Sequence, residues 1–391
     1  MSILYLTYWS IHDSLSQATV YPSIRRLSHM FPGWSIVVVS IERSSDIIAD
    51  KIRPPELPNV EYIKFRSSKN GMFAKFFDFV AFPAALEKLT INRKFKFLLG
   101  RGSPAGALLY LVWRKLKINY YVESFEPHSE YMLESKVWAK WSVKYILQRH
   151  FEKKQIQTAT GLMPVSKQYQ ELLIKKGFEA RRIVTIPCVV DLKKFAFNDI
   201  SRQAMRKNLF ISGDSLVGIY VGKFGGIYFD LVDALKLFRD DFAEFGPGFH
   251  LLLLTDFKKE NLQTSLRQTG LPENRVHIFF TPHDEVPQYL SASDFGYALI
   301  KPAPSKRFCS AIKIGEYIAN GLTVVMPAHI GDDSEILREK NCASFIENNS
   351  YDRIQLFSQI NNRTKIARIA EESRSPRLAE EAYHYLLKDL P

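Results

Sequence analysis

The sequence predicts an α/β protein built from two doubly wound domains, and three observations support this. A chain of 391 residues is too long for one ordinary hydrophobic core and suits two domains. Apolar β-type runs alternate with helical patterns, which is typical of parallel sheets joined by crossover helices. Near-continuous apolar runs, such as residues 36–39 and 251–254, fit strands that are buried on both faces.

The first half of the chain alternates between strands and helical segments. The helical patterns are clearest over residues 16–30, 105–115 and 166–176. The expected strands are residues 3–6, 35–41, 60–65, 95–99, 119–122, 161–165 and 183–186.

The second half repeats the alternation after a polar stretch with little β character. Its expected strands are residues 216–221, 250–255, 276–280, 295–300, 323–326 and 343–346. The expected organisation is an N-terminal domain over residues 1–190, a linker over 191–214, a C-terminal domain over 215–370 and a helical segment over 371–391. Doubly wound sheets bind ligands at the carboxyl ends of their strands, so we expect a cleft between the two domains.

Composition favours an ordinary cytoplasmic protein. Hydrophobic residues make up 46% and charged residues 24% of the chain, which argues against bulk disorder. The N-terminus lacks the features of a signal peptide, and no uncharged apolar run reaches the roughly 18 residues that span a bilayer. Cys188, Cys309 and Cys342 are odd in number and far apart, so we expect neither a disulfide framework nor a zinc site. We also expect no other metal and no cofactor.

Positive charge is concentrated in the first half. Residues 1–190 carry 28 Lys and Arg against 15 Asp and Glu, whereas residues 191–391 carry 25 against 26. This asymmetry favours an anionic partner for the first half: a membrane surface, a phosphate-bearing acceptor or nucleic acid. The alternative is a basic surface that serves solubility alone.

One stretch of the first half suggests membrane contact. Its basic residues recur every four positions and its aromatic residues form an adjacent stripe, which predicts a helix that lies on an anionic membrane. The residues are Lys136, Lys140 and Lys144 with Trp138, Trp141 and Tyr145. The alternative is that the aromatic face packs on the sheet.

The strongest chemical signal begins at Ser310. Ser310 is a candidate N-cap, residues 311–320 have a helical pattern, and Gly321 is a C-terminal stop. A helix N-terminus attracts anions, and Lys313 adds a full charge in the first turn. Glu316 shares that face and can accept hydrogen bonds from two vicinal hydroxyls of a ribose. The alternative is a capped helix with a solvated Lys–Glu ion pair.

Three segments together resemble family 4 retaining glycosyltransferases, which have the GT-B fold of two Rossmann-like domains. Residues 312–325 resemble the donor-binding signature of that family. Residues 164–195, with Pro-Val-Ser at the start and Ile-Pro-Cys-Val-Val-Asp near the end, are similar to the segment that closes the N-terminal domain. Residues 219–223 resemble the first strand of the donor domain. The first 150 residues resemble the family only in their βα alternation.

The resemblance implies that the C-terminal domain holds a nucleotide diphosphate sugar. It implies that Glu316 binds the ribose and that Lys223 touches the diphosphate. The other residues expected to line the diphosphate are Ser310 and Lys313, those expected at the base are Thr281, Pro282 and His283, and those expected at the donor sugar are Phe308 and Cys309.

Two positions depart from the family pattern. The family often carries a second Glu eight residues before the ribose-binding one, and this chain has Phe308 there. The family also often has a Lys shortly after the Lys223 position. This chain has Gly225 and Gly226 instead, whose backbone amides can approach phosphates.

Polar residues follow the expected strand 119–122 in the first half. We expect His128 and Glu126 on the catalytic side and Glu123 on the acceptor side, with His128 orienting a sugar hydroxyl or acting on its proton. The family resemblance implies no protein nucleophile, so no general base is assigned. The alternative is a loop histidine between helix-capping carboxylates.

The sequence thus predicts a retaining sugar transferase at the inner face of the membrane. Its expected acceptor is a saccharide or lipid-linked saccharide in surface-polysaccharide assembly. The alternatives are a sugar-nucleotide epimerase of the same fold and a scaffold that binds donor without turnover. No nucleic-acid motif appears, and no G-x-G-x-x-G follows the first strand, which disfavours a nucleic-acid binder and a dinucleotide oxidoreductase.

Overall fold

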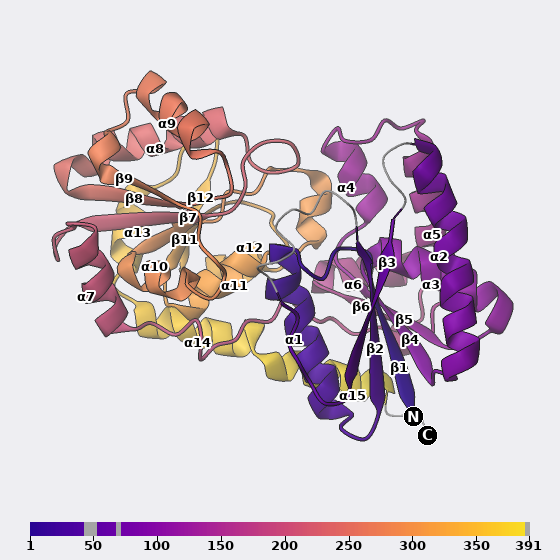
Figure 1. The fold of residues 1–391 in the computed structure, drawn as a ribbon. Coiled ribbons are helices and arrows are strands. Elements are labelled where there is room, and N and C mark those ends of the chain that lie inside the picture. Colours follow the sequence, from indigo (N-terminus) through magenta and orange to yellow (C-terminus); the bar gives the residue numbers. More distant parts are fainter. Residues whose placement is uncertain (43–52, 68–71, 388–391) are drawn as a thin grey trace. The chain divides into compact units, whose positions relative to one another are not determined.

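The computed structural model describes residues 1–42, 53–67 and 72–387 (Figure 1). The chain divides into two compact units. Unit 1 comprises Met1–Glu134, Trp138–Pro187 and Ala379–Pro391, and unit 2 comprises Ser135–Val137 and Cys188–Leu378.

Unit 1 is built on a parallel six-stranded sheet in the order β3-β2-β1-β4-β5-β6. Its strands are β1 (Ser2–Thr7), β2 (Ser35–Glu42), β3 (Val60–Arg66), β4 (Phe97–Arg101), β5 (Tyr120–Ser124) and β6 (Gly161–Pro164). Its helices are α1 (Ser14–Met30), α2 (Met72–Arg93), α3 (Gly102–Leu116), α4 (His128–Glu134), α5 (Val143–Thr158), α6 (Lys167–Lys175) and the short 3-10 helix η1 (Ala180–Arg182). The terminal helix α15 (Pro376–Leu387) begins at the end of unit 2 and returns to unit 1.

Unit 2 repeats this plan in the order β12-β11-β10-β7-β8-β9. Its strands are β7 (Leu216–Val221), β8 (Phe249–Leu254), β9 (Val276–Phe279), β10 (Phe295–Tyr297), β11 (Thr323–Pro327) and β12 (Ala343–Ile346). Its α-helices are α7 (Asp199–Asn208), α8 (Leu231–Phe245), α9 (Lys259–Gln268), α10 (Val286–Ala292), α11 (Ile312–Ala319), α12 (Asp333–Glu339), α13 (Arg353–Gln359) and α14 (Arg363–Arg374). Three 3-10 turns complete it: η2 (Gly246–Gly248), η3 (Glu273–Arg275) and η4 (Pro304–Phe308).

Each sheet is covered on both faces, as the continuous apolar strands predicted. In β7, Val217 and Ile219 belong to one core cluster with α11, whereas Tyr220 belongs to a second cluster with α8 on the other face. In unit 1, α1 and α15 pack with Ile3 and Tyr5 on one face. Successive side chains of a strand point to opposite faces, so both must be apolar when helices cover both.

The strand order reverses at one point in each sheet. The first strand of each unit, β1 or β7, lies inside the sheet, and the chain later crosses to its other side to form β4 or β10. The neighbours β1–β4 and β7–β10 therefore mark the topological switch points, where loops diverge above the carboxyl ends of the strands. Ligand sites of open α/β sheets form at these points.

The predicted strand over residues 183–186 is wrong. Ile183 forms only an isolated parallel bridge with Leu162, although the N–H groups of Val184 and Ile186 donate to β6 carbonyls. The apolar pattern reflects burial, because Val184 and Ile186 pack on the core of unit 1, but the segment does not extend the sheet by a further strand.

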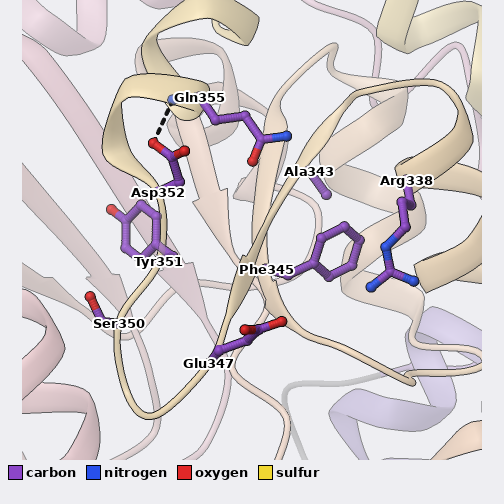
Figure 2. A pocket seen from close by; sticks show the side chains of 8 residues that line it. All are labelled: Arg338, Ala343, Phe345, Glu347, Ser350, Tyr351, Asp352 and Gln355. Carbon is purple, nitrogen blue, oxygen red and sulfur yellow. Dashed lines mark hydrogen bonds between the residues drawn. The ribbon is translucent and has the colours of Figure 1, made fainter.

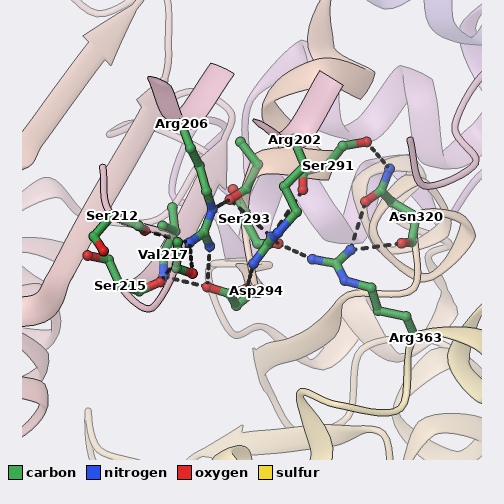
Figure 3. A network of polar contacts seen from close by, with 12 residues as sticks. Arg202, Arg206, Ser212, Ser215, Val217, Ser291, Ser293, Asp294, Asn320 and Arg363 are labelled. Atoms are coloured by element: carbon green, nitrogen blue, oxygen red, sulfur yellow. Dashed lines mark hydrogen bonds and ion pairs between the residues drawn. The ribbon is translucent and has the colours of Figure 1, made fainter. Parts of the chain in front are cut away.

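Residues 191–214, expected as a linker, contain helix α7. Arg202 and Arg206 of α7 lie 2.7 and 2.8 Å from the Asp294 carboxylate, and Arg206 also donates to three carbonyls of the loop before β7 (Figure 3). Arg363 of α14 joins the same network through Asn320. Because these guanidinium groups donate to backbone carbonyls and pair with a carboxylate of unit 2, α7 is an integral part of unit 2.

The expected basic stripe on one helix is also wrong. Residues 135–142 form turns between α4 and α5, and Lys136 has a positive φ of 59°. Tyr145 is buried and donates its hydroxyl to Glu130 at 3.1 Å. In the described part of the chain, no helix combines the length and apolar character that a bilayer crossing requires.

Candidate functional site

The predicted donor residues gather at the carboxyl edge of the unit 2 sheet. Residues 222–226 follow β7 at the switch point, and Lys301 lies in the loop after the neighbouring strand β10. The Lys301 ammonium donates to the Gly226 carbonyl at 3.2 Å. This contact joins the two loops that diverge at the switch point. It also places the Lys301 ammonium at the predicted donor site, and nothing in the sequence pattern had indicated this residue.

The Gly225–Gly226 turn has a left-handed backbone. Their φ values are +79° and +60°, which glycine adopts without the steric cost of a side chain. The Gly225 N–H donates to the Phe229 carbonyl at 2.9 Å. The expectation that the Gly225 amide faces phosphate is therefore corrected, because that amide closes the turn.

Lys223 extends from the same loop and is half-exposed. Its ammonium lies 2.7 Å from the Asp256 carboxylate, which follows β8. Its backbone carbonyl accepts a hydrogen bond from the buried Tyr220 hydroxyl at 2.7 Å. Tyr220 thus fixes the backbone of the loop, while the lysine side chain remains at the surface of the site.

Lys313 approaches this loop from the first turn of α11. Its ammonium lies 4.9 Å from the centre of the Tyr220 ring, and a Cβ atom on Gly222 would stand 2.6 Å from it. Desolvation lowers the pKa of Lys313 to about 8, although the nearby Glu316 carboxylate acts in the opposite direction. The absence of a side chain at Gly222 leaves space for this cation beside the end of β7.

Glu316 lies one turn further along α11 and is buried, with 4% exposure. Its Oε1 atom is 2.6 Å from His283 Nε2, and His283 Nδ1 is 3.5 Å from the Lys194 ammonium. Lys194 also pairs with Asp284 at 2.6 Å. The sequence predicts His283 at the nucleotide base, whereas in the structure its imidazole contacts the predicted ribose-binding carboxylate of Glu316.

The hydrogen-bonding capacity of the two neighbours favours one tautomer of His283. A carboxylate can only accept a hydrogen bond and an ammonium can only donate one. Neutral His283 with its proton on Nε2 satisfies both neighbours, because Nε2–H donates to Glu316 and Nδ1 accepts from Lys194. The Phe195 ring, 5.4 Å away, packs against the imidazole and restricts its rotation.

Ser310 is not the N-cap of α11. The helix begins at Ile312, and the N-cap residue is Ala311. The Ser310 hydroxyl accepts from the Cys188 N–H at 3.1 Å and from the buried Arg374 guanidinium, which also pairs with Asp333. This hydroxyl therefore ties α14 and the start of unit 2 to the loop before α11.

The remaining predicted donor residues lie in neighbouring loops. Phe308 ends η4 under the Arg307 guanidinium, 5.5 Å from the ring centre, and Cys309 is buried. Thr281 and Pro282 precede His283 in the loop after β9.

Glu123 in unit 1 has a structural position. Its carboxylate is buried and accepts hydrogen bonds from Tyr5 at 3.3 Å, from Arg101 and from Tyr383 of α15. The expectation that it faces an acceptor is corrected, because the carboxylate is buried and its oxygens are already paired with a cation and two phenols.

Glu126 lies in the loop after β5, and His128 is the first residue of α4. His128 Nδ1 is 3.8 Å from Glu126 Oε1, and the imidazole meets the Trp138 ring edge-on at 5.5 Å between centres. Both side chains are partly exposed. They sit beyond the carboxyl end of β5, so in unit 1 they occupy the ligand-binding edge of the sheet.

A pocket of about 480 Å³ opens elsewhere in unit 2 (Figure 2). Phe345 and Tyr351 line it beside Arg338, whose guanidinium covers the Phe345 ring at 4.3 Å. Asp352 caps α13 by accepting the Gln355 N–H at 2.9 Å. None of the residues predicted for the donor lines this pocket. Among the described residues, no group of three or more His, Cys, Asp or Glu is arranged to hold a metal ion.

Solved structures match both units of the chain. Sucrose-phosphate synthase from Thermosynechococcus elongatus superposes with a TM-score of 0.74 at 14% identity, covering 99% of this chain and 100% of that one. HepE from Anabaena in complex with UDP superposes with a TM-score of 0.70 at 14% identity, with coverage of 99% and 100%. The chain has the GT-B fold. The fold class predicted from the sequence, two doubly wound α/β units, is confirmed.

The same fold also occurs in a different class of enzyme. UDP-GlcNAc 2-epimerase from Neisseria meningitidis, bound to UDP-GlcNAc, matches with a TM-score of 0.64 at 12% identity over the full length of both chains. No family model and no curated protein sequence matches this chain. Identities at this level establish the fold, and the chemistry must be argued from the site.

Proposed function

We propose that this protein is a glycosyltransferase that takes a sugar from a nucleoside diphosphate sugar held by unit 2. The observation that carries the proposal is the grouping of Lys223, Lys301 and Lys313 with the buried Glu316 around one switch point. Cations there match a diphosphate, and a buried carboxylate one helical turn away matches the vicinal hydroxyls of a ribose.

The parts of the donor would be held by different groups. The N-terminus of α11 and the Lys313 ammonium would face the diphosphate, with Lys223 and Lys301 contributing from the two loops. Glu316 would accept from the ribose hydroxyls, because His283 occupies one of the roughly four lone-pair positions of a carboxylate and leaves others available. The nucleotide sugar is a substrate of this site.

The finer assignment follows the sequence resemblance to family 4 retaining glycosyltransferases. In a retaining transfer, the bond from the anomeric carbon to the donor phosphate breaks and a bond to the acceptor hydroxyl forms on the same face. The departing phosphate takes the acceptor proton. Glu126 and His128 would orient the acceptor, a saccharide or lipid-linked saccharide of surface-polysaccharide assembly at the cytoplasmic face of the membrane.

A screen of nucleotide sugars by thermal shift tests donor binding. A donor at about 100 times its Kd raises the free energy of unfolding by roughly 2.7 kcal/mol, which displaces the melting temperature visibly. The binding donor is then incubated with and without saccharide acceptors, and free nucleoside diphosphate is measured. Release that depends on the acceptor supports transfer.

The second candidate is a sugar-nucleotide epimerase, favoured by the similarity to UDP-GlcNAc 2-epimerase. An epimerase converts its nucleotide sugar without an acceptor. A changed sugar configuration in the acceptor-free incubation would favour the epimerase, and binding without any product would favour a scaffold.

A further inference from the structure

Unit 1 presents a compact apolar surface at the start of α5. Trp141, Val143, Ile146 and Leu147 lie within seven residues and are 82%, 70%, 51% and 42% exposed. The opposite side of the helix faces the interior of unit 1, where Tyr145, Gln148 and Phe151 are buried. Val143, Ile146 and Leu147 are spaced by three and four residues, so they share one outward face. We name these four residues the α5 apolar face.

The α5 apolar face is surrounded by positive charge. Lys140, Lys144 and Arg149 are exposed, and the sequence has no Asp or Glu from residue 138 to residue 151. A carboxylate of α4 faces this group, because Glu130 Oε1 lies 3.9 Å from Arg149 Nε. The Lys140 ammonium lies 5.9 Å from the Trp141 ring centre, so charge and aromatic surface are adjacent.

The backbone beneath this surface is held firmly. Ser142 caps α5 by accepting the Tyr145 N–H at 3.3 Å. Further along the helix, Glu152 accepts from the Ser129 N–H and hydroxyl at 2.9 and 2.6 Å, and Gln155 donates to the Ser103 carbonyl at 3.0 Å. The outward apolar face is therefore preformed by a helix that is anchored on its other side.

We propose that the α5 apolar face docks on an anionic lipid surface. Tryptophan and aliphatic side chains enter the boundary between headgroups and acyl chains, while flanking Lys and Arg meet the lipid phosphates. The excess of 28 basic over 15 acidic residues in residues 1–190 adds long-range attraction to the same kind of surface. The proposed membrane contact is thus an apolar face with basic edges, in place of the stripe of lysines on one helix that the sequence predicts. It is independent of the proposed transferase activity.

Vesicle sedimentation of the full chain tests the proposal. The probes are phosphatidylcholine vesicles with and without phosphatidylglycerol, at low and high salt. The variants are Trp141→Ser with Ile146→Ser, which removes apolar contact, and Lys140→Glu with Lys144→Glu, which reverses charge. The matched control is Ile200→Ser with Ile354→Ser, two side chains of unit 2 that are 80% and 83% exposed.

The wild type and the control should sediment with anionic vesicles, and salt should weaken their binding. Each basic side chain near an anionic surface contributes about fivefold in affinity, so the double charge reversal should weaken binding by more than about 25-fold. The serine variant should lose at least about tenfold. Trp141 fluorescence should shift to shorter wavelength on vesicle addition, and Trp141→Phe should abolish that change.

Three results would overturn the proposal. The wild type does not bind anionic vesicles at low salt, the α5 variants bind as well as the control, or gel filtration without lipid shows a dimer that only the α5 variants abolish. The last result would identify the face as a contact between two copies. Nucleotide binding by unit 2, measured separately on the same preparations, distinguishes failure here from failure of the proposed function.

Discussion

At the scale of single residues, Glu316 has the most specific environment in unit 2. Its carboxylate is buried, accepts a hydrogen bond from His283 and has a favourable Coulombic interaction with Lys313 of the same helix. A buried carboxylate whose lone pairs are only partly hydrogen-bonded is stabilised by additional hydrogen-bond donors. In the proposed complex the ribose hydroxyls supply them.

Replacement of Glu316 by Gln keeps the shape of the side chain and removes its charge. A hydrogen bond to a charged group contributes about 1.5–3 kcal/mol, so nucleotide affinity should fall about tenfold or more. Calorimetric titration with nucleoside diphosphates measures this. Glu347→Gln is the matched control, because Glu347 lines the pocket of Figure 2. A larger loss of nucleotide affinity in Glu347→Gln than in Glu316→Gln would indicate that the nucleotide binds in that pocket.

Lys194 is expected to position Glu316 through His283. Lys194→Met removes the donor to Nδ1 and frees the imidazole to adopt the other tautomer, so the Glu316 contact weakens. One hydrogen bond has a net value of about 0.5–1.5 kcal/mol, which predicts a loss of about two- to tenfold in nucleotide affinity. Lys193→Met, at the exposed neighbouring position, is the control. Equal affinities for the two variants would remove Lys194 from the site.

Lys313 is expected to make the proposed nucleotide binding depend on pH. Burial lowers its pKa to about 8 from 10.5, so the unfolded chain binds more protons between these values, and the free energy of unfolding from this group rises with pH across that window. A bound diphosphate favours the ammonium form. Nucleotide affinity should therefore fall above pH about 8, with proton uptake in calorimetry across buffers, and Lys313→Met should show neither effect. Uptake that persists in Lys313→Met would assign the titration to another group.

At the scale of elements, buried strands were predictable and contacts between loops were not. The strands of both sheets follow from apolar runs, because a strand covered on both faces has no polar alternation. The contact between Lys301 and Gly226 depends on β10 pairing with β7, and these strands are some 75 residues apart in the chain. The His283–Glu316 contact similarly joins the loop after β9 to α11.

Local periodicity also failed where the backbone turns. The lysine and tryptophan spacing before α5 fits a helix, but residues 135–142 form turns with Lys136 in the left-handed region. Ser310 has a typical capping residue type, yet Arg374 and the Cys188 amide take its hydroxyl. In both cases a tertiary contact or backbone conformation replaced the local preference.

Helix α15 should stabilise unit 1 through Tyr383. Its hydroxyl donates to the buried Glu123 carboxylate beside Arg101 and Tyr5. Tyr383→Phe leaves that charge with one donor fewer and should lower the free energy of unfolding by about 1.5–3 kcal/mol in a denaturant titration. Tyr228→Phe, at an exposed tyrosine of unit 2, should have no such effect. Equal stability of the two variants would mean that Arg101 and Tyr5 suffice for Glu123.

At the scale of the whole molecule, two units of the same architecture carry different surface chemistry. Unit 2 gathers cations and a buried carboxylate at its switch point, whereas unit 1 places Glu126 and His128 at the edge of its sheet and an apolar face with basic edges on α5. The fold alone is shared by a sucrose-phosphate synthase and an epimerase. The proposed roles, donor binding by unit 2 and acceptor and membrane contact by unit 1, therefore depend on these side chains, and biochemical experiments must test them.

The most direct test of the central claim is a titration of the full chain with a panel of nucleoside diphosphate sugars, followed by measurement of free nucleoside diphosphate with and without saccharide acceptors. The account predicts that at least one donor binds and that free nucleoside diphosphate appears only with an acceptor. Glu316→Gln and Lys223→Met should weaken the binding of that donor, whereas Lys236→Met, at an exposed position of α8, should not. Failure of every donor to bind, or equal binding by all three variants, would contradict it.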